Sequence, residues 1–491
     1  MTNPRSRCLL LLCLTLLAAC GSSTAPQVAQ LDGKAVCGPG SMPETGLQGQ
    51  VSAEDRESGR SQQGYRCNLE LVGQYQGEGA SWVNPSYGHC AYLATSFGGI
   101  PTKKSQGVQV VDVSDPQHPV LAGKLTSLSM LLGPWESLKV HEGRGLLGGV
   151  AVGPAVGAGF FDLYDISEDC TQPKLLNSFT GNLTLPTNFL AHEGAFSPDG
   201  KTYWSTGAVG GSMTAIAIDD PAHPRIVYQG LRVLLNHGFS FSDDGRRMYL
   251  SMGVPAGIVI LDIGDVQDRA PIPVVREVGS LYWNLLGYSQ QSVPVRYGGQ
   301  PYLIVADEFA SEGVHIVDLT DETNPVDVTH LQLEIQKEEH LDARRRDTTG
   351  NGLFGYEAHY CTVDRHDDPT AMACGYFQSG IRVFDIRDPR APREIAYFNP
   401  PAQVGKTAML RGSEHAAGLI TALGVPASDL AHFNFGTYSS YILDPTQLVS
   451  NNLSADWCGS PPRFVGDQLW VTCQDNGFMV LRFTNGVYPL E

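Results

Sequence analysis

Hydrophobic and polar residues alternate in short runs along most of this chain, and glycine and turn residues separate the runs. In seven places a glycine opens a β-rich run that usually ends in an aspartate and a turn containing proline. Alternation with a period of two, bounded by turn residues, predicts strands. A motif that returns at this spacing predicts a repeat architecture. The seven copies occupy residues 107–116, 159–167, 211–221, 257–265, 313–321, 380–389 and 477–484.

Other strands surround most copies of the motif. Two strands joined by a tight turn precede it, as at residues 195–205 and 240–250, where Pro-Asp-Gly and Asp-Asp-Gly supply the turn. A fourth strand follows, as at residues 120–125, 174–179 and 393–398. Four antiparallel strands in this order are the blade of a β-propeller, so the sequence predicts an all-β fold.

The two ends of the chain predict how the ring closes. The last copy stops seven residues before the C-terminus at Glu491, so its blade lacks a fourth strand. Residues 68–74 form a strand with no blade before it, and placing it on the last blade removes two exposed edges. The expected fold is therefore a seven-bladed β-propeller over residues 67–491, with insertions at 332–356 and 400–456.

The aspartate of the motif recurs too often to mark an active site. Alanine replaces it at Ala217 and arginine at Arg482, so it is not required in every copy. We expect it to accept hydrogen bonds within the turn that follows. The five aspartates are Asp112, Asp165, Asp262, Asp318 and Asp385.

The N-terminus has the features of an export signal. Arg5 and Arg7 precede a short apolar run that ends in Leu-Ala-Ala-Cys at Cys20. This ending resembles the bacterial lipobox, which implies cleavage after residue 19, a lipid on Cys20 and a membrane as partner. Residues 20–66 would be the lipidated cysteine with a tether and extension, and Gly21 favours the outer membrane of the cell envelope. The alternative is an ordinary cleaved signal peptide.

Charge and cysteine content narrow the function further. The formal net charge of −18 repels phosphate backbones, which argues against nucleic acid as a partner. Eight cysteines follow Cys20, and an even number in an exported chain predicts disulfides. Two pairs would face each other across neighbouring strands, Cys361 with Cys374 and Cys458 with Cys473. Cys37, Cys67, Cys90 and Cys170 can pair in three ways, which the sequence does not resolve.

The motif also carries a family resemblance. Runs such as G-V-Q-V-V-D-V-S-D-P at 107–116 and G-I-V-I-L-D-I at 257–263 resemble the LVIVD-repeat β-propeller lipoproteins of bacteria. The resemblance extends from about residue 68 to the C-terminus and implies the propeller fold. It implies no particular activity, since that family has no general one.

Three histidines share one position in the predicted repeat. Aligned on the hairpin glycines Gly200 and Gly245, His192 and His237 stand at the start of the innermost strands, where side chains converge on the propeller axis. His359 matches them by its distance from the core of its strand, although its turn is longer. Three imidazoles in one place could hold a single transition metal such as Fe, Cu or Zn. The layout is similar to that of seven-bladed metalloenzymes such as the carotenoid oxygenases. The alternative is that these histidines are structural.

Nearby carboxylates extend this hypothesis. Glu136, Glu193 and Glu357 are candidates for orienting the metal ligands or for acting as a general base.

Two functions therefore compete at this stage. The first is an anchored scaffold that binds a protein, glycan or small molecule through its insertions. The second is a propeller metalloenzyme, an oxidoreductase or hydrolase, with a histidine-ligated metal at the channel mouth. The chain has no G-x-S-x-G, phosphate loop, C-x-x-C or H-E-x-x-H, so serine hydrolase, nucleotide, dithiol and zincin sites lack support.

Overall fold

The fold was analysed in a computed structural model of the chain. It describes the backbone of residues 29–30 and residues 33–94, 107–151, 160–177, 191–207, 212–231, 235–309, 312–349, 354–405, 410, 412, 413, 415 and 453–490. The predicted signal peptide, Cys20 and most of the 400–456 insertion lie outside these residues.

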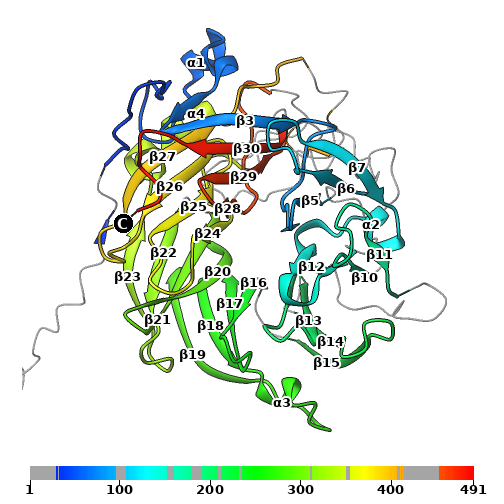
Figure 1. Cartoon of the computed structure of the whole chain (residues 1–491). Coiled ribbons are helices and arrows are strands. Elements are labelled where there is room, and N and C mark those ends of the chain that lie inside the picture. The colour runs from blue at the N-terminus through cyan, green and yellow to red at the C-terminus, as the bar shows by residue number, and fades with distance from the viewer. Residues whose placement is uncertain are drawn as a thin grey trace, which may run out of the picture.

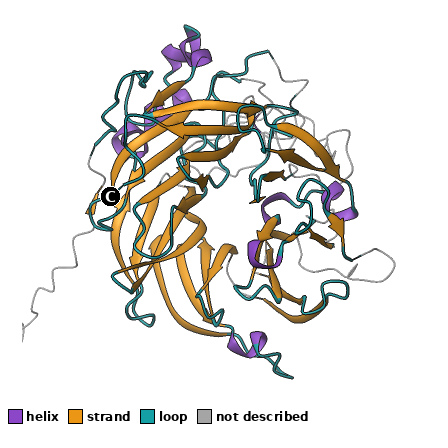
Figure 2. Ribbon diagram, in the orientation of Figure 1, coloured by secondary structure: helices purple, strands orange, loops and turns teal. Residues whose placement is uncertain are grey.

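The described chain is built almost wholly from antiparallel strands, with a few short helices at the periphery (Figure 2). Its sheets follow one another in chain order around a central region (Figure 1). The first three units each form a separate four-stranded sheet. These are β4 (Ser86–Tyr87), β5 (Cys90–Leu93), β6 (Val108–Asp112) and β7 (Val120–Leu125); β8 (Lys139–His141), β9 (Leu146–Val150), β10 (Phe161–Asp165) and β11 (Lys174–Leu175); and β12 (Ala191–Phe196), β13 (Thr202–Gly207), β14 (Ser212–Ala217) and β15 (Arg225–Leu231).

The remaining units repeat this order of strands. They are β16 (Leu235–Phe241), β17 (Arg247–Gly253), β18 (Ala256–Asp262) and β19 (Arg276–Asn284); β20 (Tyr288–Tyr297), β21 (Gln300–Phe309), β22 (Val314–Asp318) and β23 (Val326–Leu331); β24 (Cys361–Val363), β25 (Ala371–Gly375), β26 (Ile381–Asp385) and β27 (Arg393–Asn399); and β28 (Arg463–Val465), β29 (Gln468–Cys473) and β30 (Gly477–Phe483) with β3 (Leu69–Tyr75).

An N-terminal strand completes the C-terminal sheet, as the orphan strand in the sequence predicted. β3 pairs antiparallel with β30 from Leu69 opposite Phe483 to Tyr75 opposite Phe478. In Figure 1 the blue strand β3 lies beside the red strand β30. This pairing ties the two ends of the repeat region together and covers the edge that β30 would otherwise expose.

Two of the units differ from the prediction because they join into one sheet. Gly253 at the end of β17 pairs with Tyr288 at the start of β20, which links β16–β19 to β20–β23. Gly253 permits this contact, because a Cβ there would lie 2.0 Å from the Tyr288 ring. With β1 (Ala29–Gln30), which runs parallel to β23, the joined sheet has nine strands.

Hydrophobic side chains of neighbouring units pack together to form the core. Val314 and Ile316 of β22 share one buried cluster with Met372 of β25 and Phe384 of β26. Burial of aliphatic and aromatic surface between units is the main stabilising contribution in such an arrangement.

The glycine that opens the third strand of a unit has a backbone role. Gly107, Gly313, Gly380 and Gly477 adopt φ between +72° and +80°. A Cβ at Gly313 would also lie 2.2 Å from the carbonyl oxygen of Leu331 on the neighbouring fourth strand. Both a left-handed φ and this close approach require glycine.

Replacing Gly313 with alanine is expected to lower the free energy of unfolding by about 3 kcal/mol, because it combines left-handed strain with a backbone clash. Gly299→Ala is the matched control. Its φ is +81°, against +79° for Gly313, but no atom lies within 4 Å of its Cβ position. Gly299→Ala should therefore lower the free energy of unfolding by only about 1 kcal/mol. If chemical denaturation shows equal shifts of the midpoint for the two variants, the clash at Gly313 is contradicted.

The recurring aspartates close the turns, as predicted. A carboxylate oxygen of Asp112 accepts a hydrogen bond from the amide of Ser114 at 2.8 Å, and Asp318 does the same with Thr320. Asp165, Asp262 and Asp385 accept the equivalent bond two residues on. This is the Asx turn, which is structural.

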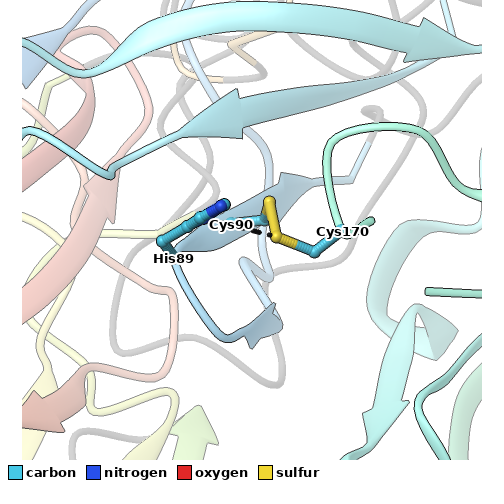
Figure 3. A group of neighbouring side chains, drawn as sticks. All are labelled: His89, Cys90 and Cys170. Carbon is cyan, nitrogen blue, oxygen red and sulfur yellow. Dashed lines mark hydrogen bonds between the residues drawn. A yellow bond between two sulfur atoms is a disulfide. The ribbon is translucent and has the colours of Figure 1, made fainter. Parts of the chain in front are cut away.

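The described residues contain four disulfides. Cys361–Cys374 and Cys458–Cys473 confirm the two predicted pairs. The pairs that the sequence left open are Cys37–Cys67 and Cys90–Cys170. Figure 3 shows the second of these, with the His89 ring beside the bridge that links the first two units.

Residues 33–66 pack against the propeller. This segment contains α1 (Ala53–Glu57), the 3₁₀ helix η1 (Arg60–Gln63) and β2 (Tyr65–Cys67), and β2 adds a fifth strand to the sheet of β24–β27. Within it, Glu44 forms an ion pair with Arg382 of β26.

The other helices lie in connections between strands. The 332–356 insertion contributes three short helices to its described part, and none of the described helices has the length and apolar character needed to cross a membrane. These elements are α2 (Leu128–Leu132), η2 (Trp135–Ser137), η3 (Glu142–Arg144), α3 (Gly264–Gln267), η4 (Glu334–Gln336), η5 (Glu338–His340) and α4 (Leu341–Asp347).

Candidate metal centre

The three histidines singled out in the sequence come together in the structure. His192 lies in β12, His237 in β16, and His359 two residues before β24, so each belongs to the start of an innermost strand. The fourth strand of an antiparallel unit ends at the edge of the sheet where the first strand starts. The connections between units, which include both predicted insertions, therefore begin at the edge that carries the histidines.

β-Bulges help to aim these side chains. The ladder between β12 and β13 skips His192, and the ladder between β16 and β17 shifts across His237. A third irregularity surrounds Gln290 in β20. A bulge frees one residue from regular pairing and redirects its side chain, which is why bulges occur beside functional sites.

The histidines converge on one carboxylate, Glu136, in the short helix η2. His192 Nε2 lies 2.6 Å from Oε2, His237 Nε2 lies 3.6 Å from the same oxygen, and His359 Nε2 lies 3.1 Å from Oε1. Ligand atoms of Glu136, His192 and His237 all lie within 4.8 Å of one another. All four residues are buried.

A second carboxylate, Glu308, completes the cluster and was missed by the sequence reasoning. Its oxygens lie 3.6 Å from His359 Nε2 and 3.9 Å from His237 Nε2. Glu308 stands at the end of β21, where the ladder with β20 skips it between the pairs Tyr288–Phe309 and Ser289–Asp307. The only sequence signal was the Asp307-Glu308 pair at the end of an otherwise apolar strand.

Backbone carbonyls fix the orientation of two histidine rings. His237 Nδ1 donates to the carbonyl of Gln290 at 3.1 Å, and His359 Nδ1 donates to the carbonyl of Gly459 at 2.8 Å. With Nδ1 as the donor, each Nε2 faces the cluster and offers a lone pair to a cation when the ring is neutral. This is how metal-ligating histidines are held in proteins.

Three of the converging atoms form no ordinary hydrogen bond, although Glu136 Oε1 accepts one from Gln290 Nε2 at 3.2 Å. Glu136 Oε2, His192 Nε2 and His359 Nε2 have no partner in hydrogen-bond geometry among the described residues. Buried polar groups in native proteins are normally satisfied, so each exception needs an explanation. Atoms that share a central cation would show this arrangement.

The protonation of the cluster reflects its two carboxylates. Burial opposes a charge on His359, but Glu136 and Glu308 outweigh it and raise its pKa to about 10. Burial and the neighbouring His192 hold the pKa of His237 well below its usual range. Burial would raise the pKa of Glu136, but His192 and His359 outweigh it and keep that pKa low. In this form of the cluster, protons supply the positive charge that the carboxylates require.

The other two candidate glutamates have different environments. Tyr360 donates from its hydroxyl to Glu193 Oε1, and Lys139 Nζ lies 3.3 Å from Oε2. Glu357 accepts a hydrogen bond from the amide of Gly355 at 2.7 Å, and burial raises its pKa to about 7. Among the described residues, no hydrogen bond or ion pair joins the Glu357 side chain to the three histidines, so a role for Glu357 beside them stays a prediction.

Aromatic rings cover the cluster. Trp135 lies 4.1 Å from His192 between ring centroids, Tyr288 lies 5.2 Å from His237, and Trp82 lies 5.1 Å from His359. Rings packed this closely exclude water, which strengthens electrostatic interactions within the site.

A cavity of about 790 Å³ begins beside the cluster. The cavity is lined by the residues that follow the three histidines in sequence, which are Glu193, Gly238 and Tyr360. Gln291, which follows Gln290, also lines it. The wall continues to the exposed residue Asp243, so the cavity extends from the buried site to the opposite edge of the sheets. Its volume falls within the usual range for small-molecule sites.

Comparisons with known proteins give similarity of fold alone. No protein-family model matches the chain, and no curated protein matches it. A putative 6-phosphogluconolactonase from Bacteroides uniformis is 12% identical, with 64% of this chain and 84% of that chain covered and a TM-score of 0.46. The periplasmic gluconolactonase of Pseudomonas aeruginosa is also 12% identical, with 62% and 82% covered and a TM-score of 0.44.

A third structure shows how little these likenesses say about activity. Saccharomyces cerevisiae Sqt1 is 10% identical, with 83% of each chain covered and a TM-score of 0.46. Scores below 0.5 at such identities carry no argument about substrate or reaction. The chain is a β-propeller protein by its own strand order, and its distinguishing feature is the buried cluster of three histidines and two glutamates.

Proposed function

We propose that this chain is a metal-dependent propeller enzyme that holds one divalent transition ion in the cluster of Glu136, His192, His237, His359 and Glu308. The observation that carries the proposal is the convergence of three buried imidazoles on two buried carboxylates without ordinary hydrogen bonds. A divalent ion would balance the charges of Glu136 and Glu308 while leaving all three histidines neutral.

The donor set fits such an ion. Imidazole nitrogens suit Fe, Cu and Zn, and carboxylates favour the divalent forms of these metals. Once bound, the ion would supply Lewis-acid or redox chemistry at the end of the cavity, which corresponds to a hydrolase or an oxidoreductase. The chain's own part is to hold the ligands, to exclude water with Trp135 and Trp82, and to provide Glu193 as a proton carrier.

Glu193 is placed for that role because it borders the cavity one residue after His192. Burial raises its pKa, although Lys139 opposes this shift. A raised pKa makes a carboxyl group a better proton acceptor, which suits a group that must accept and return a proton. The hydroxyl of Tyr360 donates to it, which orients the carboxyl group toward the cavity wall.

The proposal includes a closed ring of seven blades. All seven innermost strands contribute residues to the wall of the cavity. β3, which precedes the first unit in the chain, pairs with β30 and so completes the sheet of the last unit. The seven strands are β4, β8, β12, β16, β20, β24 and β28.

The proposal also includes a lipid anchor on Cys20, which would hold the enzyme at the cell envelope, with the outer membrane favoured by Gly21. The support for this is the sequence at residues 5–21 alone.

A ligand-binding scaffold is the second candidate. The cavity favours it too, because a 790 Å³ chamber can hold a small molecule without any reaction. A partner protein or glycan on the insertion-bearing edge belongs to the same candidate.

Elemental analysis of residues 21–491, purified without a metal-binding tag, separates the two candidates. We expect the wild-type chain to hold one more Fe, Cu or Zn ion than the His192→Ala/His237→Ala/His359→Ala variant. Equal metal contents of the folded wild type and this variant, after dialysis against these metals, would leave the scaffold as the remaining function.

A further inference from the structure

A second group of potential ligands lies in the fifth unit, outside the cluster described above. A carboxylate oxygen of Glu312 and a ring nitrogen each of His315 and His330 lie within 4.8 Å of one another. His315 is in β22 and His330 faces it across the ladder in β23. Asp307 of β21 borders the same group.

His315 has the orientation of a metal ligand. Its Nδ1 lies 2.8 Å from Asp327 Oδ2, while its Nε2 lies 3.7 Å from Asp307 Oδ2 and has no hydrogen-bond partner among the described residues. Its side chain is 2% exposed. A histidine held by a carboxylate at one nitrogen, with the other nitrogen free, is the carboxylate–histidine–metal pattern.

His330 and Glu312 form the more open side of the group. Their side chains are 22% and 21% exposed. His330 Nε2 donates to the backbone carbonyl of Glu312 at 2.5 Å, so the lone pair of the neutral ring is on Nδ1. The His330 ring stacks on His315 with centroids 4.4 Å apart. An ion from solvent could therefore reach the group between these two side chains.

The charge of the group is unbalanced. Asp307, Asp327 and Glu312 bring three carboxylates together, and no lysine or arginine of the described chain forms an ion pair with them. One oxygen of Asp307 and one of Asp327 also lack hydrogen-bond partners. Buried carboxylates are normally paired with cations or coordinate metals.

We propose that Asp307, Glu312, His315 and His330 form a second site for a divalent transition ion, of which Zn²⁺ is the probe. Asp327 is the positioning residue that holds His315. Two imidazoles with carboxylates are donors that Zn²⁺ and Fe²⁺ accept. The inference does not depend on the first centre, although Asp307 and Glu308 are neighbours on β21 and serve the two sites separately.

The local tryptophan gives this site a signal of its own. Trp283 stacks on His315 with centroids 4.3 Å apart and donates from Nε1 to Asp307 at 2.6 Å. A paramagnetic ion bound here would quench Trp283 emission. The difference in Co²⁺ quenching of fluorescence between wild type and Trp283→Phe separates the contribution of Trp283 from that of the other five tryptophans.

The test is Zn²⁺ binding to metal-free residues 21–491 by equilibrium dialysis, with Co²⁺ quenching as a second readout. We expect two ions per chain, falling to one in Glu312→Gln/His330→Gln, with affinity at the altered site reduced by at least about 100-fold. His118→Gln is the control, because His118 also lies 2.8 Å from an aspartate but in an exposed turn. It should retain both ions.

The outcomes separate the two proposed sites. One ion that survives Glu312→Gln/His330→Gln but is lost in Glu136→Gln would overturn the second site and leave the first. One ion with the opposite behaviour would retain the second site and reject the first. If the double variant fails to fold, absence of Co²⁺ quenching of Trp283 in the wild-type protein overturns the inference.

Discussion

Replacing Glu136 with glutamine is expected to lower the affinity of the first centre for Zn²⁺ by at least about 100-fold. All three histidines approach this carboxylate, and glutamine preserves its shape but removes the charge and one of its two acceptor oxygens. Replacing residues that only orient metal ligands typically lowers metal affinity by about 10- to 100-fold. Replacing a group inside the cluster should lower it by at least as much. Competition against a chelator of known affinity measures the change.

Glu357→Gln is the matched control for this measurement. Glu357 is as deeply buried as Glu136, but its carboxylate accepts a hydrogen bond from the backbone of Gly355. Its substitution should change the affinity for Zn²⁺ by no more than a few-fold. Equal losses in both variants would mean that the effect comes from general disturbance of the fold, and the assignment of Glu136 would fail.

Replacing Arg382 with alanine is expected to destabilise the fold by about 3–5 kcal/mol. The Arg382 side chain is fully buried and pairs with Glu44 at 2.8 Å and with Glu394 at 3.0 Å. Its Nε also donates to the carbonyl of Ser379. Removal of the guanidinium leaves Glu394 without a cation and Glu44 with only Lys34, whose Nζ lies 3.9 Å away, and this is the costly way to break a buried ion pair.

Arg482→Ala gives the comparison on the surface. Arg482 pairs with Glu70 at 2.7 Å, but the two side chains are 44% and 45% exposed, so water replaces the interaction. The expected cost is below about 1 kcal/mol. Chemical denaturation of both variants measures the difference. A midpoint for Arg382→Ala that matches that of Arg482→Ala would show that the buried triad does not hold residues 33–66 to the propeller.

The repeating units were predictable because their signals are local. Each unit is recognisable in the sequence by alternating hydrophobic and polar residues, a turn, and a glycine whose φ must be positive. The fourth strand predicted at residues 120–125, for example, matches β7. The pairs Cys361–Cys374 and Cys458–Cys473 were predictable for the same reason, since the two cysteines of each pair are 13 and 15 residues apart, on either side of a short turn.

The candidate site was only partly predictable. The repeat register placed His192, His237 and His359 at one edge, and the structure brings them together there. Glu308 was missed because it belongs to a second strand, outside the aligned position. Glu357 was included because it is close to His359 in sequence, yet its side chain accepts a hydrogen bond from the amide of Gly355 within its own loop.

By itself the sequence determined the all-β units, their order, the turn role of the aspartates and the edge on which three histidines stand. These follow from neighbours along the chain, where periodicity and turn chemistry act. Only the tertiary structure decided that Cys90 pairs with Cys170, that Gly253 joins two units, and that Glu136 and Glu308 meet the histidines. Each of these depends on packing between residues far apart in the chain, and the sequence pattern carries no measure of that distance.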